Sequence, residues 1–330
     1  MTTISADLAA GIRVQPGRAR SRPARTVREG LIRLSLIGCA AFSIFTTFSI
    51  ALVLFGETYR FFQLEEVSVT EFATGTEWNP LLGAEHHFGV WPLIIGTLQV
   101  TVVAMLVALP LGFLTAIFLS EYAPRRLRAV LKPVLEVLAG VPTVVYGFFA
   151  LTFITPALQE ISDVFEVYNA MSAGLAVGVM CLPIVSSLTE DALQAVPRSL
   201  REGAYAVGGT KFDVTLRVVY PAALSGAIAA ALLAVARAVG ETMIVALAAG
   251  NLATSFDGWT DVRGVAEAVN PATQTQTMTA YMVQIFLGDA SNFGPEYFSS
   301  YAVGATLFIM TMILTIIGHR VRVRFREAYE

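Results

Sequence analysis

The sequence predicts an all-α membrane protein with about six transmembrane helices and both termini in the cytoplasm. Hydrophobic residues make up 55% of the 330 residues and charged residues only 14%, against about 25% charged in soluble domains. Long apolar stretches alternate with polar connections, and Lys and Arg gather on every second connection. These observations indicate lipid as the solvent of most of the chain.

Six stretches are long enough to cross a bilayer, which requires about 20 mainly apolar residues. They are residues 34–55, 92–119, 134–156, 170–188, 222–250 and 300–318. Several exceed that length, so tilted or kinked helices are expected. Pro110, Pro142 and Pro183 lie inside three of the stretches, where neighbouring helices must satisfy the backbone groups that proline leaves unpaired.

The distribution of Lys and Arg sets the predicted orientation. All but three of the 22 Lys and Arg residues fall within residues 13–33, 125–132, 198–217 and 320–326. Of the remaining three, Arg60 and Arg263 lie on the other side, and Arg237 lies inside the fifth stretch. Because the basic side of a membrane protein faces the cytoplasm, both termini are predicted to be inside.

The chain divides into four predicted parts. Residues 1–30 are expected to form a disordered basic cytoplasmic arm, which can bind anionic membrane lipid or act only as a topology signal. Residues 31–90 hold the first span and an acidic external loop, residues 91–320 the core, and residues 321–330 a cytoplasmic tail. Within the external loop 251–299, residues 277–287 predict a short helix that lies on the surface or re-enters the membrane.

The connection from Val196 to Pro221 predicts two helices separated by a glycine hinge. Leu200, Ala204 and Val207 recur on one helical face, and Gly208 follows as a left-handed cap. Thr210 and Asp213 then have the spacing of a capping box. A stiff element that projects between two spans is suited to receive force from a soluble partner.

This connection resembles the EAA loop of ABC importer permeases. The matching residues are Glu202-Gly203-Ala204, Gly208 and Val218 to Pro221, at the family spacing and with mild substitutions. The resemblance implies that Glu202, Gly203, Ala204 and Gly208 couple the chain to an ATPase subunit. The sequence contains no Gly-Lys pair and hence no phosphate-binding loop of its own, so ATP and Mg²⁺ are expected in a separate polypeptide, with no cofactor in this chain.

Two charged residues lie within the fifth stretch, where they are costly and usually functional. Arg237 lies roughly 23 Å from the inner surface, counted from Ala222 at about 1.5 Å per residue. Its planar fork of donors matches phosphate oxygens, which predicts an anion contact in the pathway. Glu241, four residues on, is predicted to share its helix face and neutralise Arg237, or to reject the wrong protonation state. The alternative is a purely structural ion pair.

Further segments resemble PstC-type phosphate permeases. They are residues 139–147, 190–193, 237–242 and 276–281. The resemblance covers about two-thirds of the chain and implies a type I ABC importer permease fold with a cytoplasmic coupling helix. It also implies a bacterial phosphate importer in the cytoplasmic membrane, with a sister permease (PstA type), a dimeric ATPase (PstB type) and an external phosphate-binding protein (PstS type).

The same reasoning leaves alternatives open. Thr143 and Tyr146 could line the pathway as hydrogen-bond donors or bond to nearby carbonyls. The substrate could be another oxyanion, such as molybdate or sulfate. A self-contained channel, a secondary transporter or a scaffold without transport are further alternatives, and only the ABC permease needs the projecting loop. We expect no metal site, no enzymatic activity in this chain and no nucleic-acid partner.

Overall fold

The computed structural model describes residues 23–81, 86–289 and 294–326. Most of the predicted basic arm and the end of the predicted tail lie outside these residues. The chain forms two compact units, residues 1–53 and 54–330. The described part of the first unit belongs to one helix, α1 (Pro23–Phe61). Most of its side chains from Glu29 to Val53 are exposed and apolar, as a lipid-facing span requires.

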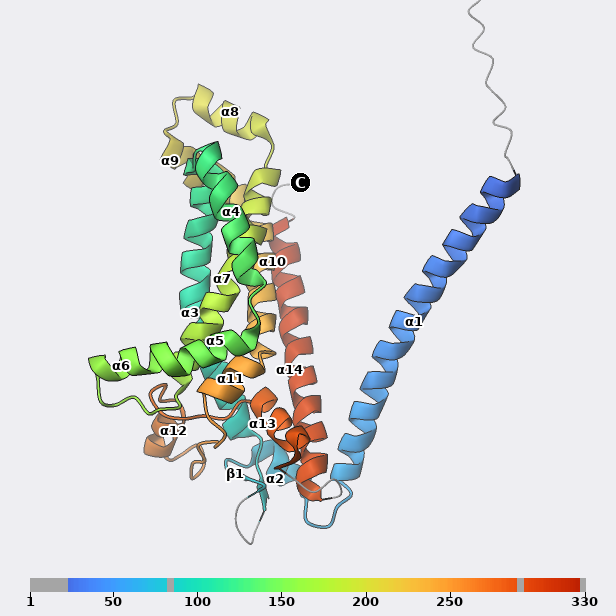
Figure 1. Cartoon of the computed structure of the whole chain (residues 1–330), viewed down its shortest axis with the longest axis vertical. Helices are drawn as coiled ribbons and strands as arrows, with labels where there is room; N and C mark the ends of the chain where they lie inside the picture. Colours follow the sequence, from blue (N-terminus) through green and yellow to red (C-terminus); the bar gives the residue numbers. More distant parts are fainter. Residues whose placement is uncertain (1–22, 82–85, 290–293, 327–330) are drawn as a thin grey trace, which may run out of the picture. The chain divides into compact units, whose positions relative to one another are not determined.

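The second unit is built around four long helices that run side by side. They are α3 (Trp91–Ile117), α7 (Ala170–Ala195), α10 (Tyr220–Val239) and α14 (Pro295–Arg326), as Figure 1 shows. Glycines permit the close approach of α3 and α7, because a Cβ at Gly174 would lie 2.6 Å from the Val103 side chain and one at Gly112 2.6 Å from Val185. Small residues at helix contacts are the usual way in which membrane helices pack closely.

The prediction that residues 134–156 form a single spanning helix is wrong. Residues 134–156 divide into α4 (Arg125–Ala139), which packs on α7, and α5 (Thr143–Phe149). α5 continues through η2 (Ala150–Ile154) into α6 (Thr155–Ile161), and this segment runs across the bundle (Figure 1). The break lies at Val141-Pro142, because proline has no N–H and forces the residue before it out of the helical region. Pro110 and Pro183 lie inside continuous helices.

The fifth predicted span is also two helices. After α9 (Lys211–Val214) and η3 (Thr215–Val219), α10 continues to Val239. Residues 240–242 then leave the helix, and α11 (Met243–Ala248) follows and packs against α5. The Glu241 carboxylate accepts the Ile244 N–H at 3.4 Å and so satisfies a free donor at the start of α11.

The predicted number of spans is confirmed within the described residues. Six helical segments are long and apolar enough to cross a membrane. Their bounds are Glu29–Phe61, Trp91–Tyr122, Thr143–Ile161, Ala170–Ala195, Lys211–Val239 and Pro295–Arg324. The second of them ends in η1 (Phe118–Tyr122). The largest difference from the prediction is the third span, which begins after the corner at Pro142.

One end of the bundle carries a small cap made from the two long loops. It contains α2 (Val69–Thr74), the antiparallel pair β1 (Trp78–Asn79) and β2 (His87–Phe88), α12 (Val262–Ala268), α13 (Met278–Gln284) and η4 (Ile285–Asp289). Aromatic rings form its core, with Trp78 and Tyr281 edge to face at 4.9 Å. The predicted short helix over residues 277–287 is therefore confirmed, but as a buried element, since Met278 and Tyr281 are fully buried.

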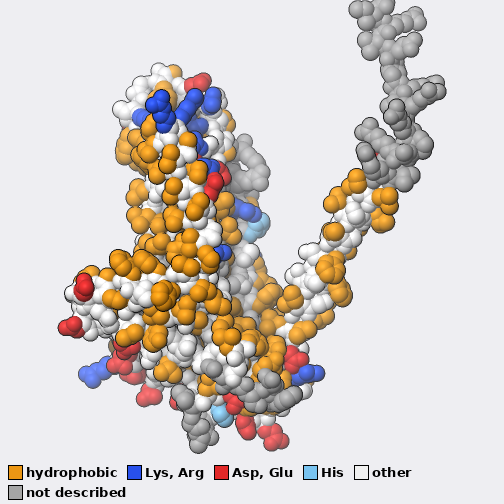
Figure 2. All heavy atoms as spheres, viewed as in Figure 1, with side chains coloured by type: hydrophobic (Ala, Val, Ile, Leu, Met, Phe, Trp, Pro, Cys, Tyr) orange, Lys and Arg blue, Asp and Glu red, His pale blue; other side chains and the backbone are white. Residues whose placement is uncertain are grey.

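The opposite end carries α8 (Arg198–Ala206), which projects from the bundle (Figure 1). Gly208 follows it with φ +87°, and the Thr210 hydroxyl caps α9 by accepting the Asp213 N–H at 3.2 Å. The predicted helix, glycine hinge and capped second helix are confirmed. Figure 2 shows Lys and Arg gathered at this end and Asp and Glu at the other, with hydrophobic side chains between them.

Candidate functional site

Three of the segments singled out in the sequence meet where α10 breaks. Gly147 on α5 lies against α11, because a Cβ there would be 3.2 Å from the Ile244 Cα. From the third segment, the Thr279 hydroxyl on α13 donates to the Glu241 carbonyl at 2.6 Å. Residues 139–147, 237–242 and 276–281 therefore surround one stretch of non-helical backbone. Such backbone within a membrane occurs where it is buried in protein or lines a water-filled path.

Arg237 lies in the last turn of α10 and is exposed on the surface of the chain. Its Nη2 lies 3.7 Å from the Met180 Sδ on α7. A thioether is a weak acceptor, and the described residues provide the guanidinium with no other hydrogen-bond or ion-pair partner. Most of the donors of a charged side chain in a predicted span are therefore free to bind something outside this chain.

The predicted pair between Arg237 and Glu241 is wrong in this structure. α10 ends at Val239, so the two residues do not share a helix face, and no ion pair joins them. Glu241 is buried, with 7% of its surface exposed, and its carboxylate caps α11. Arg237 and Glu241 nevertheless flank the same end of α10. They therefore belong to one region of the bundle.

Tyr146 and Thr143 lie on α5, just after the corner. The Tyr146 hydroxyl donates to the Leu138 carbonyl in the last turn of α4 at 2.9 Å. Its ring is buried in the core that α3, α7 and α11 share. Tyr146 therefore fixes the α4–α5 corner through a backbone carbonyl. Thr143 is half-buried in the first turn of α5, and its hydroxyl has no hydrogen bond with the described residues.

The residues predicted to couple the chain to an ATPase lie together on and after α8. Glu202 and Gly203 are exposed, whereas Ala204 packs against the core below the helix. Gly208 has the positive φ that L-residues avoid. Apolar side chains are exposed beside them, with Val207 88% and Leu200 47% exposed. α8 thus presents a mixed polar and apolar surface of the kind that binds another protein.

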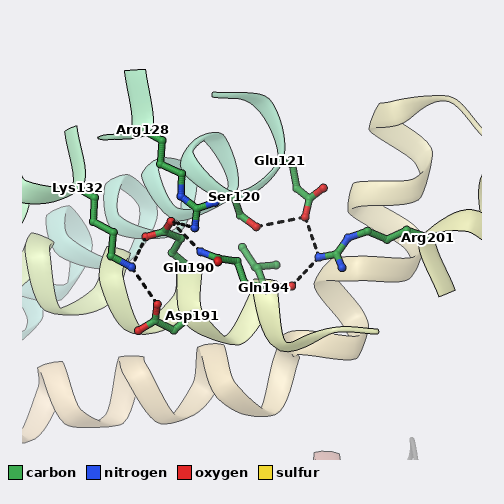
Figure 3. A network of polar contacts seen from close by, with 9 residues as sticks. Ser120, Glu121, Arg128, Lys132, Glu190, Asp191, Gln194 and Arg201 are labelled. Carbon is green, nitrogen blue, oxygen red and sulfur yellow. Dashed lines mark hydrogen bonds and ion pairs between the residues drawn. The ribbon is translucent and has the colours of Figure 1, made fainter. Parts of the chain in front are cut away.

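A polar network that sequence reasoning did not predict lies beneath α8 (Figure 3). Glu190 on α7 is fully buried and forms ion pairs with Arg128 at 2.5 Å and Lys132 at 3.3 Å, both on α4. Burial alone would lower the pKa of Lys132, but its hydrogen bond to Asp191 and the charges of Asp191 and Glu190 raise that pKa overall. Glu190, an acidic residue at the end of a long apolar stretch, was the available signal for this network, but residue spacing could not identify its partners.

Arg201 forms the second part of this network. Its Nη1 donates to the Val196 carbonyl at 2.6 Å and its Nη2 to the Leu193 carbonyl at 2.7 Å. Nη2 also lies 3.1 Å from the Glu121 Oε1 on η1. One side chain of α8 therefore contacts the ends of two membrane-spanning segments.

Comparisons with known proteins agree with this architecture. Residues 108–327 match the family described as "Binding-protein-dependent transport system inner membrane component". The chain is 32% identical over 297 residues to "Probable ABC transporter permease protein YqgH" of Bacillus subtilis, covering 90% of this chain and 92% of the relative. It is also 32% identical over 329 residues to "Phosphate transport system permease protein PstC" of Xylella fastidiosa, covering 94% of each.

A solved structure shares the fold. The crystal structure of a bacterial alginate ABC transporter, in complex with an alginate pentasaccharide-bound periplasmic protein, contains a chain that superposes with a TM-score of 0.64 at 13% sequence identity. The match covers 90% of this chain and 95% of that chain. The predicted type I ABC importer fold is thereby confirmed. This chain therefore belongs to the binding-protein-dependent transport system inner membrane components, the permease subunits of ABC transporters, as its family match, its sequence relatives and its helices together show.

Proposed function

We propose that this chain is the permease subunit of an ATP-driven importer that carries inorganic phosphate across the bacterial cytoplasmic membrane. The relatives named as phosphate transport permeases support phosphate as the substrate. The observation that carries the proposal is Arg237, a cation at the break of a spanning helix whose only partner in the described chain is a thioether.

The exposure of Arg237 has a physical consequence. Placing an arginine against lipid at the centre of a bilayer costs about 2.5–3.5 kcal/mol even on insertion scales. The exposed guanidinium therefore faces a second permease subunit or a water-filled path between the two. Because its planar fork can donate two parallel hydrogen bonds to an oxyanion, Arg237 is the residue that contacts phosphate, and Thr143 offers a free hydroxyl on α5.

Transport in this proposal depends on α8. The exposed surface of Glu202, Gly203, Val207 and Leu200 docks on the ATPase subunit, which binds ATP and Mg²⁺. The hydrolysing site lies in that subunit, and this chain moves the ion. A sister permease and an external phosphate-binding protein complete the assembly.

The distribution of charge supports the proposed orientation. Lys and Arg gather at the α8 end, toward which the C-terminal end of α14 also runs (Figures 1 and 2). Because the basic side faces the cytoplasm, α8 and the C-terminal end of α14 lie inside, and the Arg-rich residues 13–33 favour the same side for the N-terminus. The cap that contains α2 and α13 then faces the external binding protein.

Uptake of labelled phosphate tests the proposal in cells that express the complete transporter. At equal membrane abundance, Arg237→Gln should lower uptake by about tenfold or more, because a charge-assisted contact contributes about 1.5–3 kcal/mol. Arg263→Gln, which removes a cation from the cap outside the spans, is the matched control. Wild-type uptake in Arg237→Gln would contradict the anion contact. Uptake that molybdate or sulfate blocks more strongly than unlabelled phosphate would contradict the substrate.

A further inference from the structure

Arg201 ties the projecting helix to the membrane-embedded part of the chain. Its two terminal nitrogens donate to the Val196 and Leu193 carbonyls at the end of α7. One of them also pairs with Glu121 at the end of the second span (Figure 3). These three acceptors come from two different spanning segments. α8 has no other ion pair to the bundle among the described residues.

The environment of Arg201 favours a rigid attachment. The Arg201 side chain is 18% exposed and that of Glu121 only 9%, so water screens the pair weakly. Leu193 lies in the last turn of α7 and Val196 is its C-cap, so both carbonyls stand at the helix end, where acceptors lack intrahelical i+4 partners. Because the guanidinium is planar, its nitrogens cannot move independently. α8 cannot shift without either breaking these contacts or carrying the two span ends with it.

We propose that Arg201 is a positioning residue for transport, which makes α8 move as one body with the inner ends of the second span and of α7. The proposal rests on the function proposed above, in which the ATPase acts on α8. Arg201 contacts neither the substrate nor ATP. It converts a movement of α8 into a movement of the two central spans.

The network of Figure 3 continues from α7 toward the candidate site. Glu190 lies one turn before Leu193 and forms ion pairs with Arg128 and Lys132 on α4. α4 leads to the corner that Tyr146 closes through Leu138. Beyond the corner, α5 packs on α11 beside the break that follows Arg237. A displacement of the α7 end therefore has a contiguous path to the pathway residues.

The attachment can be measured on the full chain without substrate or ATPase. Amide hydrogen exchange of residues 198–206 should become roughly tenfold faster in Arg201→Gln, because the helix loses its anchor to the bundle. Arg217→Gln is the matched control, since Arg217 is an exposed arginine of the same connection whose one ion pair, with Asp213, spans 3.7 Å. Unchanged exchange in Arg201→Gln overturns the proposal.

The transmission is measured in proteoliposomes with the complete transporter, as phosphate taken up per ATP hydrolysed. In Arg201→Gln the ATPase subunit should still assemble and hydrolyse ATP, but uptake per ATP should fall roughly tenfold, within the usual range of coupling between sites. Arg201→Lys should recover only part of the ratio, because a single nitrogen replaces two. A wild-type ratio in Arg201→Gln overturns the proposal.

A milder variant covers the case in which Arg201→Gln fails to assemble. Glu121→Gln keeps both carbonyl bonds of Arg201 and removes only the charge of its third acceptor. This variant should assemble normally, show a partial loss of uptake per ATP, and show faster exchange in residues 198–206. A Glu121→Gln transporter with wild-type values of both would overturn the proposal. Failure of the wild-type complex to import phosphate would contradict the proposed substrate and leave the exchange experiment decisive.

Discussion

Replacing Arg128 with methionine should destabilise the α4–α7 contact strongly. Arg128 lies 2.5 Å from Glu190, whose carboxylate is only 1% exposed. The methionine keeps much of the apolar stem but leaves a buried negative charge with less compensation. Lys132, at 3.3 Å, remains the only cation beside that charge in the described structure.

The magnitude follows from the burial of the pair. Removing one partner of a buried ion pair costs about 3–5 kcal/mol. Because Lys132 still compensates part of the Glu190 charge, we expect a loss of free energy of unfolding at the low end of this range, about 3 kcal/mol. A loss of 1 kcal/mol lowers the thermal midpoint by roughly 2 °C in chains of 150–250 residues, and by less in larger chains. The midpoint of Arg128→Met should therefore fall by about 6 °C or somewhat less. Arg128→Met/Glu190→Met should recover most of this loss, because an apolar pair leaves no buried charge.

Thermal unfolding of the purified chain in detergent, followed by loss of the monodisperse peak in size-exclusion chromatography, measures these midpoints. Arg125→Met is the matched control, because Arg125 begins the same helix, is exposed and should change stability by less than about 0.5 kcal/mol. Two results would refute the reasoning. One is an Arg128→Met midpoint equal to that of Arg125→Met, and the other is a double variant less stable than Arg128→Met.

Three smaller predictions follow from single positions. Gly208→Ala should lower uptake, because its φ of +87° costs an L-residue about 1–2 kcal/mol; wild-type uptake in Gly208→Ala would contradict the hinge. Tyr146→Phe should lower the thermal midpoint by roughly 2 °C, because it leaves the Leu138 carbonyl without its 2.9 Å donor. A fluorescent protein fused to the C-terminus should be bright in cells, since it folds to the fluorescent form in the cytoplasm; a dark fusion would reverse the orientation.

Local sequence patterns predicted the elements whose physics is local. Apolar length predicted six spans, and the capping and glycine signals around Gly208 and Thr210 predicted the form of the projecting connection. The prolines were harder to interpret. Pro110 and Pro183 lie inside continuous helices, whereas Pro142 turns the chain. Pro142 follows Gly140 and Val141, so weak helix propensity adds to the proline effect there.

The errors arose where a prediction assumed that a helix continued. The spacing of Arg237 and Glu241 implies a shared face only if α10 includes Gly240, and the helix ends one residue before it. Ion pairs between distant segments were also beyond sequence reasoning. Arg201 and Glu121 lie 80 residues apart, and only the packed structure shows that they meet.

The contrast between the charged groups gives the strongest reason to assign a role to Arg237. Beneath α8, the chain neutralises Glu190 with two cations and supplies Arg201 with a carboxylate and two carbonyls. At the break of α10 it leaves an arginine beside one thioether, and the nearby carboxylate of Glu241 is directed to the backbone of α11. Since an uncompensated charge in a membrane is costly, a structural arginine would be expected to have partners like those of Arg201. An arginine kept without them is available to an anion.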